Sequence, residues 1–208
     1  MTMKSILLGG ALALGLSATS QAADLLNAGF ETGDLAGWST QDGPVEVVTD
    51  ADDAIAAPPF GEHFTATEGG YFARLTAGPD SGVYTLLFQP FSISVASRIS
   101  FDAAFLAFDY APYDDDAYVR VYRLGAPEIF SEILFASSVS AVGDQGHTSW
   151  ARYTSGELAA GDYVFEAAVR NIEDPDATYS SQLLVDNVAV SVPEPGAWAL
   201  MILGFGGA

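Results

Sequence analysis

Apolar and polar residues alternate along most of the chain between positions 24 and 192, and turn-forming residues interrupt this pattern at short intervals. A period of two is typical of β-strands that bury one face. The chain has no long amphipathic period of the kind that predicts a helix in this part. Strands are therefore predicted over a series of short ranges: 45–49, 71–76, 83–88, 91–95, 98–108, 117–124, 128–135, 148–154, 163–170 and 182–191.

Two interruptions shape this prediction. Residues 50–68 contain Pro58-Pro59 and several acids, so a long surface loop is expected there. Pro90 cannot donate a backbone hydrogen bond and is expected to separate the strands on either side of it. Many short strands joined by turns predict an all-β domain, a two-sheet antiparallel β-sandwich (jelly roll) over 24–192.

Alternation also predicts which side chains face solvent in 117–122. The small and β-branched residues at the odd positions are expected in the core, and Tyr118, Arg120 and Tyr122 on the opposite face. Two rings and a guanidinium on one face could stack on sugar rings and donate hydrogen bonds to hydroxyls, so the three residues are candidates for glycan binding. The alternative is that the tyrosines reflect β-propensity alone.

Charge and composition narrow the possible partners. The chain of 208 residues has a formal net charge of -20, with 27 acidic against 7 basic residues. Nucleic acid and anionic membranes carry the same sign, so neither is an expected partner. Such a chain suits calcium, which takes oxygen ligands. The absence of cysteine excludes disulfides, thiol catalysis and thiolate metal sites.

The N-terminus, residues 1–22, has the pattern of a secretory signal peptide with a signal helix. Lys4 precedes an apolar run over 6–16, and small residues follow up to Ala22. Cleavage is expected after Ala22 or Ala23. The alternative is a buried N-terminal helix, which the short polar, small-residue segment after the apolar run disfavours.

The other end, residues 193–208, carries a more specific motif. Pro193-Glu194-Pro195 is followed by an apolar stretch that includes Trp-Ala-Leu-Met. This resembles the sorting tail of PEP-CTERM proteins, in which an exosortase of Gram-negative bacteria processes a Pro-Glu-Pro motif and an apolar helix during export. The resemblance implies export to the cell surface or extracellular matrix, with the exosortase as a partner and transient membrane contact through the tail. The apolar stretch is shorter than the ~20 residues that span a bilayer, and no arginine cluster follows it, so the tail is expected to be either truncated or a decayed copy.

A glycine-rich segment opens the domain. Residues 27–38 read Asn-Ala-Gly-Phe-Glu-Thr-Gly-Asp-Leu-Ala-Gly-Trp and hold Glu31 between two large aromatics, Phe30 and Trp38. One interpretation is an ordered loop with two core anchors. The other is that Glu31 is a metal ligand that ties this loop to the last strand. The segment resembles the N-terminal signature of jelly-roll carbohydrate-binding and galactose-binding-like modules.

The last strand supplies the second candidate ligand. By period two, Asp186 shares a face with Leu184, Val188 and Val190, which are expected in the core. A carboxylate that points inward needs a positive or hydrogen-bonding partner. In the modules that this chain resembles, the acids of Gly-Phe-Glu and of the closing Asp-Asn-Val motif meet at a calcium ion, which implies a structural Ca2+ between Glu31 and Asp186. The alternative is that Asp186 accepts hydrogen bonds from loop amides.

The run Asp114-Asp115-Asp116 lies just before the strand at 117–124. Adjacent carboxylates repel one another unless they are solvated or bind a cation. A solvated turn is the main interpretation and calcium the alternative. The spacing does not match an EF-hand loop, so no EF-hand site is expected.

Catalytic motifs are missing from the sequence: it has no Gly-x-Ser-x-Gly, no His-Glu-x-x-His and no phosphate-cradling loop. The expected protein is therefore an exported, non-catalytic β-sandwich that contacts extracellular polysaccharide. A structural or adhesive protein that binds another protein is the first alternative, and a small glycan-active enzyme the second.

Overall fold

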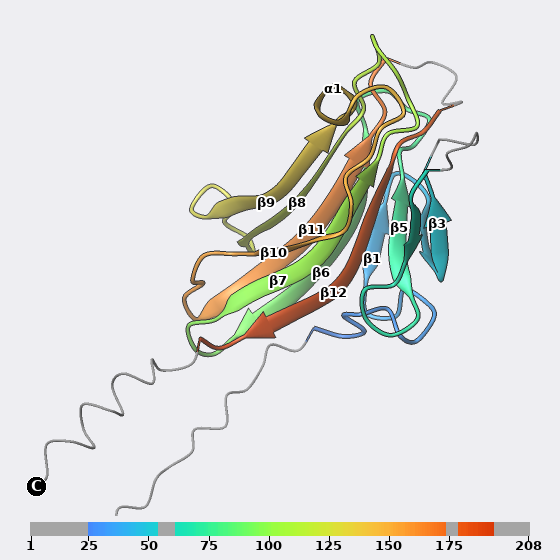
Figure 1. Cartoon of the computed structure of the whole chain (residues 1–208). Helices are drawn as coiled ribbons and strands as arrows, with labels where there is room; N and C mark the ends of the chain where they lie inside the picture. Colours follow the sequence, from blue (N-terminus) through green and yellow to red (C-terminus); the bar gives the residue numbers. More distant parts are fainter. Residues whose placement is uncertain (1–24, 54–60, 174–178, 194–208) are drawn as a thin grey trace, which may run out of the picture.

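A computed structural model describes residues 25–53, 61–173 and 179–193, and in this part of the chain two antiparallel five-stranded sheets pack face to face (Figure 1). The predicted all-β, two-sheet sandwich of the jelly-roll type is confirmed. The signal segment 1–22 and the sorting motif from Glu194 onward lie outside the described residues. Within the described ranges, no helix is long and apolar enough to cross a membrane.

The first sheet has the strand order β1-β6-β11-β8-β9, and the second has the order β10-β7-β12-β5-β2. A separate hairpin, β3-β4, forms a small third sheet, and a single helical turn, α1, follows β9. The bounds are β1 Ser39–Gln41, β2 Val45–Val48, β3 Asp50–Asp52, β4 His63–Thr65, β5 Phe72–Thr76, β6 Tyr84–Ile93, β7 Arg98–Leu106, β8 Asp116–Arg123, β9 Ser131–Ser138, α1 Val139–Val142, β10 Ala151–Thr154, β11 Gly161–Arg170 and β12 Gln182–Ser191.

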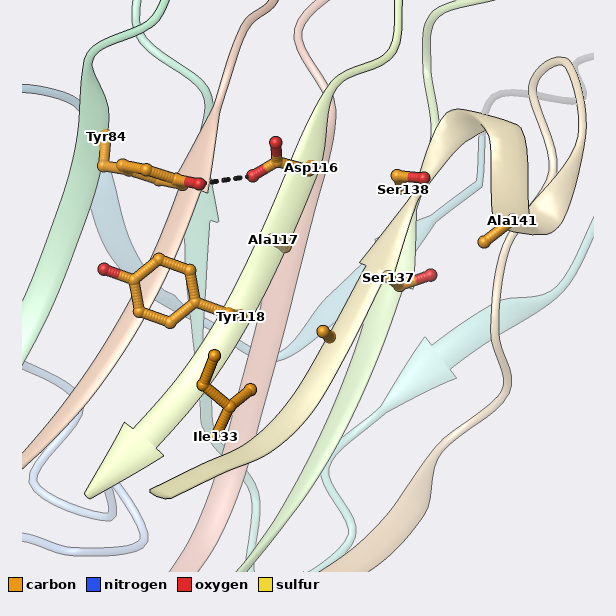
Figure 2. A pocket seen from close by; sticks show the side chains of 9 residues that line it. Tyr84, Asp116, Ala117, Tyr118, Ile133, Ser137, Ser138 and Ala141 are labelled. Carbon is orange, nitrogen blue, oxygen red and sulfur yellow. Dashed lines mark hydrogen bonds between the residues drawn. The ribbon is translucent and has the colours of Figure 1, made fainter. Parts of the chain in front are cut away.

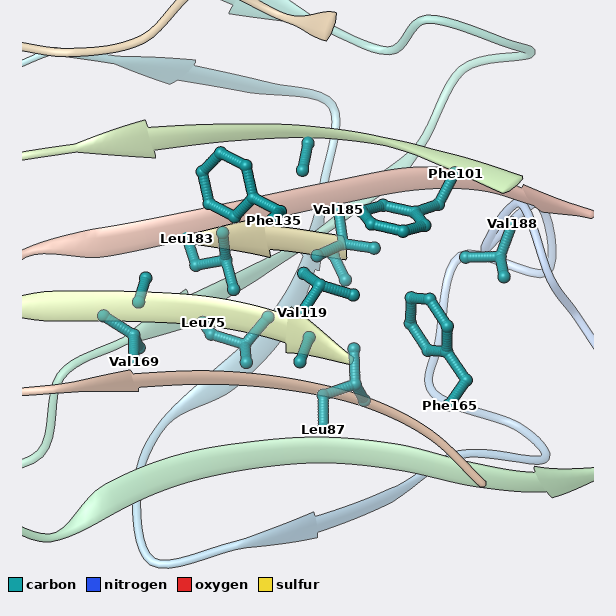
Figure 3. Packing of buried hydrophobic residues seen from close by; sticks show 14 of the residues in the cluster. Leu75, Leu87, Phe101, Val119, Phe135, Phe165, Val169, Leu183, Val185 and Val188 are labelled. Carbon is teal, nitrogen blue, oxygen red and sulfur yellow. The ribbon is translucent and has the colours of Figure 1, made fainter. Parts of the chain in front are cut away.

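The main core lies between the two large sheets. Phe165 of β11 packs edge-to-face on Phe101 of β7 at 5.3 Å and on Trp38 at 5.8 Å between ring centroids. Trp38 in turn stacks on Phe30 at 5.1 Å. Figure 3 shows Phe101 and Phe165 pointing toward each other from opposite sheets. The two aromatics of the glycine-rich segment are therefore core anchors, as one of the two interpretations of that segment predicts.

The segment 50–68 is not the long surface loop that the sequence predicts. Strands β3 and β4 pair within it and cover the outer face of the second sheet. Ala51 and Phe64 are buried there against Phe72 and Leu184, and Trp150 donates a hydrogen bond to the Thr65 carbonyl at 3.0 Å. The prediction of a loop was wrong because a three-residue strand shows too little alternation to be recognised in a segment that also contains two prolines and several acids.

Pro90 does not divide a strand either, since β6 runs continuously from Tyr84 to Ile93 and pairs with β11 along its whole length. On its other side, β6 pairs with β1 only at residues 86–88. Pro90 therefore lies where the strand has one partner, and a residue without an N–H is tolerated at such an edge.

Candidate functional site

The outer face of the first sheet carries the predicted glycan-binding residues. Along β8, Ala117, Val119 and Val121 are at most 2% exposed in the main core, which confirms the predicted alternation. Tyr118, Arg120 and Tyr122 are half-buried on the opposite face. All three lie together and share one hydrogen-bonding partner.

That partner is Glu166 of β11, which is only 5% exposed. Its Oε1 accepts hydrogen bonds from the Tyr118 hydroxyl at 2.9 Å and from Arg120 Nε at 2.8 Å. Arg120 Nη2 lies 2.7 Å from the same oxygen, and the Tyr122 hydroxyl donates to Oε2 at 3.3 Å. A buried carboxylate with a cation and two hydroxyl donors avoids the cost of an unpaired charge and holds all three side chains in place.

Arg120 also lies against both rings of this group. Its guanidinium carbon is 5.4 Å from the centroid of Tyr118 and 4.7 Å from that of Tyr122, within the range of cation–π contact. Burial, together with the nearby Glu166 charge, raises the pKa of both tyrosines. The hydroxyls therefore stay neutral donors at physiological pH. We call Tyr118, Arg120, Tyr122 and Glu166 the Glu166 cluster.

A second polar group adjoins this cluster on the same face. The Tyr84 hydroxyl donates to Asp116 Oδ1 at 2.7 Å, and Arg170 Nη2 lies 2.6 Å from Asp116 Oδ2. The rings of Tyr84 and Tyr118 meet edge-to-face at 5.0 Å. Burial and the hydrogen bond to Asp116 raise the pKa of Tyr84 to about 12. The rings of β6 and β8 thus form one continuous surface across β11.

A hollow of about 450 Å³ opens beside these rings, between β8, β9 and α1. Figure 2 shows Tyr84 and Tyr118 on one side of it, Ile133 below them, and Ser138 and Ala141 on the other side. Ile133 is 63% exposed, an unusual state for a large apolar residue on a sheet face. Aromatic and aliphatic surface next to hydroxyl and carboxylate groups suits a ligand that has both C–H faces and hydroxyls.

Sequence reasoning missed Tyr84, Asp116 and Glu166 as partners of the predicted residues. Glu166 carried a signal, because it is the one acid within the apolar run Tyr163 to Val169 and falls at an even position, opposite the core. The contact itself depends on strand pairing, because the register between β11 and β8 places Glu166 opposite Arg120. That register depends on tertiary structure and cannot be read from one strand.

The two predicted metal ligands both contact one loop, residues 67–71. Glu31 accepts hydrogen bonds from the Gly70 amide at 3.0 Å and the Tyr71 amide at 3.0 Å. Asp186 Oδ2 accepts from the Thr67 amide at 2.7 Å, the Thr67 hydroxyl at 2.9 Å and the Glu68 amide at 3.1 Å. Its Oδ1 accepts from the amide of Asn187 at 2.6 Å.

Asp186 is fully buried, as expected, but not on the predicted face. A β-bulge lies between Asp186 and Ala189, and Asn187 within it has a φ of 51°. The extra residue changes the alternation, so Val188 points into the main core while Leu184 packs under the hairpin β3-β4. Asp186 therefore lies opposite Asp102 on the outer side of the second sheet, rather than with Val188.

Burial raises the pKa of Asp186, and the hydrogen bonds from Glu68 and Thr67 oppose this shift. The contacts around Asp186 are those that the hydrogen-bond alternative predicts. Among the described residues, no group of three or more histidines, cysteines, aspartates or glutamates is placed to hold a metal ion. The structural Ca2+ between Glu31 and Asp186 stays a prediction, for which chelation is the test.

The three adjacent aspartates do not form one solvated turn. Asp114 accepts from the Ser140 amide at 2.7 Å, while Asp115 is fully buried and accepts from the Ile172 amide at 2.9 Å. Asp116 pairs with Arg170. Each side chain points to a different element, which relieves the repulsion that the sequence alone implied.

Comparison with known proteins found solved structures that are similar to this chain in fold. No protein-family model and no curated protein matches this chain. Among solved structures, the chain is similar to TmCBM61, solved with beta-1,4-galactotriose (16% identity, TM-score 0.48, 79% of this chain and 94% of that one). It is also similar to the K3 cleaved adhesin domain of Lys-gingipain from Porphyromonas gingivalis (18%, 0.47, 80% and 98%). A third is the CBM22-1 xylan-binding domain of Paenibacillus barcinonensis Xyn10C (12%, 0.44, 83% and 94%).

Proposed function

We propose that this chain is an exported, non-catalytic protein that binds polysaccharide at the cell surface or in the extracellular matrix of a Gram-negative bacterium. The observation that carries the proposal is the Glu166 cluster with the adjoining hollow. Rings, a guanidinium and hydroxyls are collected on one sheet face, and a buried carboxylate fixes their positions. Preorganised side chains lose little conformational entropy when a ligand binds, which favours affinity.

The chemistry of the face selects the ligand class. Pyranose rings present C–H faces that pack on the rings of Tyr84, Tyr118 and Tyr122, while their hydroxyls reach Asp116 and Ser138 at the edge of the hollow. A ligand without hydroxyls would make no hydrogen bonds to these polar groups and would gain less from the edge of the hollow. A long anionic polymer is disfavoured by the net charge of -20.

Export belongs to the same proposal and rests on the two ends of the chain. The signal peptide directs secretion, and the Pro193-Glu194-Pro195 motif is the feature that an exosortase would process. Membrane contact is then transient and made through the tail. A surface or matrix location would place the sheet face among the polysaccharides that it binds.

A glycan array followed by calorimetry on the purified exported protein tests the binding proposal. Tyr122→Ala should weaken binding of the selected glycan about fivefold, because a lost aromatic contact costs about 1 kcal/mol. Glu166→Gln should also weaken it, since it removes the charge that holds Arg120. Tyr71→Ala, an exposed tyrosine outside this face, is the matched control and should leave affinity unchanged.

Three results would contradict the proposal. Glycan binding that survives both Tyr122→Ala and Glu166→Gln would move the site elsewhere. No binding across the array, together with capture of a defined protein partner, would favour the adhesive alternative. Turnover of a bound glycan by the same sample would instead identify an enzyme.

A further inference from the structure

A second hollow lies at the end of the sandwich where α1 is found (Figure 1). It has a volume of about 330 Å³ and is formed by the loop before β8 and by α1 with the residues that follow it. None of its lining residues belongs to the lining of the hollow beside Tyr118. The residues that matter for its chemistry are Pro112, Tyr113, Asp114, Ser140 and Asp144.

One tyrosine lines this hollow, and two more continue from it through ring contacts. The Tyr113 ring lines it and meets the Tyr110 ring edge-to-face at 5.8 Å, and Tyr110 meets Tyr179 at 6.0 Å. Tyr110 is 41% exposed and Tyr179 is 44% exposed. Rings clustered in solvent rather than in the core offer negatively polarised faces to a ligand.

Two carboxylates flank the rings. Asp114 accepts hydrogen bonds from the Ser140 amide at 2.7 Å and the Ser140 hydroxyl at 3.0 Å, and Asp144 accepts from the Ala111 amide at 2.9 Å. The hydrogen bond from the Ser140 amide lowers the pKa of Asp114. No basic residue is found among the described residues that line the hollow. Fixed rings and ionised acids without a cation match the chemistry of an ammonium group.

We infer that this hollow binds the ammonium group of an amino sugar within a glycan; the inference rests on the proposed function and narrows its ligand. A neutral sugar would satisfy the rings but leave both carboxylates without a counter-charge, and an anionic sugar would be repelled. Both hollows border α1, which contributes Ala141 to the hollow beside Tyr118 and Val139 and Ser140 to this one, so one glycan chain could contact both. That continuity favours a glycan over a lysine-rich peptide, which carries the same ammonium chemistry.

Two ligands with the same backbone test the inference. Oligomers of glucosamine carry an ammonium group where those of N-acetylglucosamine carry a neutral acetamide, so calorimetry compares the two at mildly acidic pH, and the salt dependence separates the effect of charge from that of the acetyl group. The glucosamine oligomer should bind at least about fivefold more tightly, from one exposed cation–π contact and one exposed charge pair. Added salt should reduce this difference. An oligolysine peptide of similar length should bind more weakly than the glucosamine oligomer.

Variants separate this site from the sheet face. Asp114→Asn with Asp144→Asn, and separately Tyr113→Ala, should each remove most of the preference for glucosamine. Glu128→Gln, an exposed acid in the turn before β9, is the control for loss of a negative charge away from the hollow and should keep the preference. Tyr122→Ala should weaken both oligomers equally if the proposed function is correct, because it acts on the shared backbone.

Each remaining result overturns the inference. Equal binding of the two oligomers, or a preference that persists in the Asp114 and Asp144 double variant, would show that the hollow does not recognise an ammonium group. Tighter binding of oligolysine would assign it to a peptide. A loss of binding in Tyr122→Ala that is absent in the loop variants would leave the proposed function standing and the inference refuted.

Discussion

Replacement of Asp186 by alanine tests how the last strand holds the loop at residues 67–71. The carboxylate is fully buried and accepts four hydrogen bonds, from Thr67 N and Oγ1, Glu68 N and Asn187 N. Alanine removes all four acceptors at once. It also removes the only acidic side chain that β12 offers to a calcium ion beside Glu31.

The expected loss of stability follows from these contacts. A hydrogen bond to a charged group contributes ~1.5–3 kcal/mol, but burial of the carboxylate costs part of this sum. Thr67 and Glu68 are exposed, so water can replace the acceptor in the variant. We therefore expect Asp186→Ala to lower the free energy of unfolding by about 2–4 kcal/mol, a fall in Tm of about 5–15 °C for a domain of this size.

Thermal unfolding with and without a calcium chelator is the assay. If hydrogen bonds alone hold the loop, the chelator leaves the Tm of the wild type unchanged. If calcium joins Glu31 and Asp186, the chelator lowers the wild-type Tm and has no effect on Asp186→Ala. Calcium at one hundred times its dissociation constant would contribute about 2.7 kcal/mol, well above the error of the measurement. Glu31→Gln keeps an amide oxygen for Gly70 and Tyr71 and isolates the loss of charge.

Three outcomes would refute parts of this reasoning. A loss below about 1 kcal/mol in Asp186→Ala would show that the hydrogen bonds do not hold the loop. A chelator effect that is the same in Asp186→Ala and in the wild type would exclude calcium at this position, as would the absence of calcium by elemental analysis.

Three further predictions address the core, the tyrosines and export. Phe165→Ala should lower the free energy of unfolding, measured by urea denaturation, by about 3–5 kcal/mol, because removal of a buried ring that packs on Phe101 and Trp38 leaves a cavity. A loss under about 1 kcal/mol would contradict this packing. The raised pKa of Tyr84, about 12, favours its neutral form in the folded state, so its contribution is complete below the ordinary tyrosine pKa of about 10 and is lost as pH rises through about 12. Tyr84→Phe removes the titrating hydroxyl and should reduce the dependence of Tm on pH between about 10 and 12. The same dependence in the variant and in the wild type would show that the raised pKa of Tyr84 does not contribute to stability. Mass spectrometry of the exported protein should show that residues 1–22 or 1–23 have been removed, whereas a cytoplasmic product with Met1 retained would refute export.

The fold class and the inward residues of β8 were predictable because both follow from local alternation. Ala117, Val119 and Val121 lie in the core as a period of two requires. The strand at 182–191 was predicted with the bounds that the structure shows. A long strand buried on one face carries its own signal, whatever packs against it.

The contacts of the candidate site depended on tertiary structure. The sequence by itself placed Tyr118, Arg120 and Tyr122 on one face, but only the register between β8 and β11 put Glu166 among them. Likewise, an acid in β12 was expected to be buried, yet the bulge after Asp186 decided which face it occupies. Strand pairing and bulges join residues that are far apart in the chain, so their effect on a side chain has no local signal to be read.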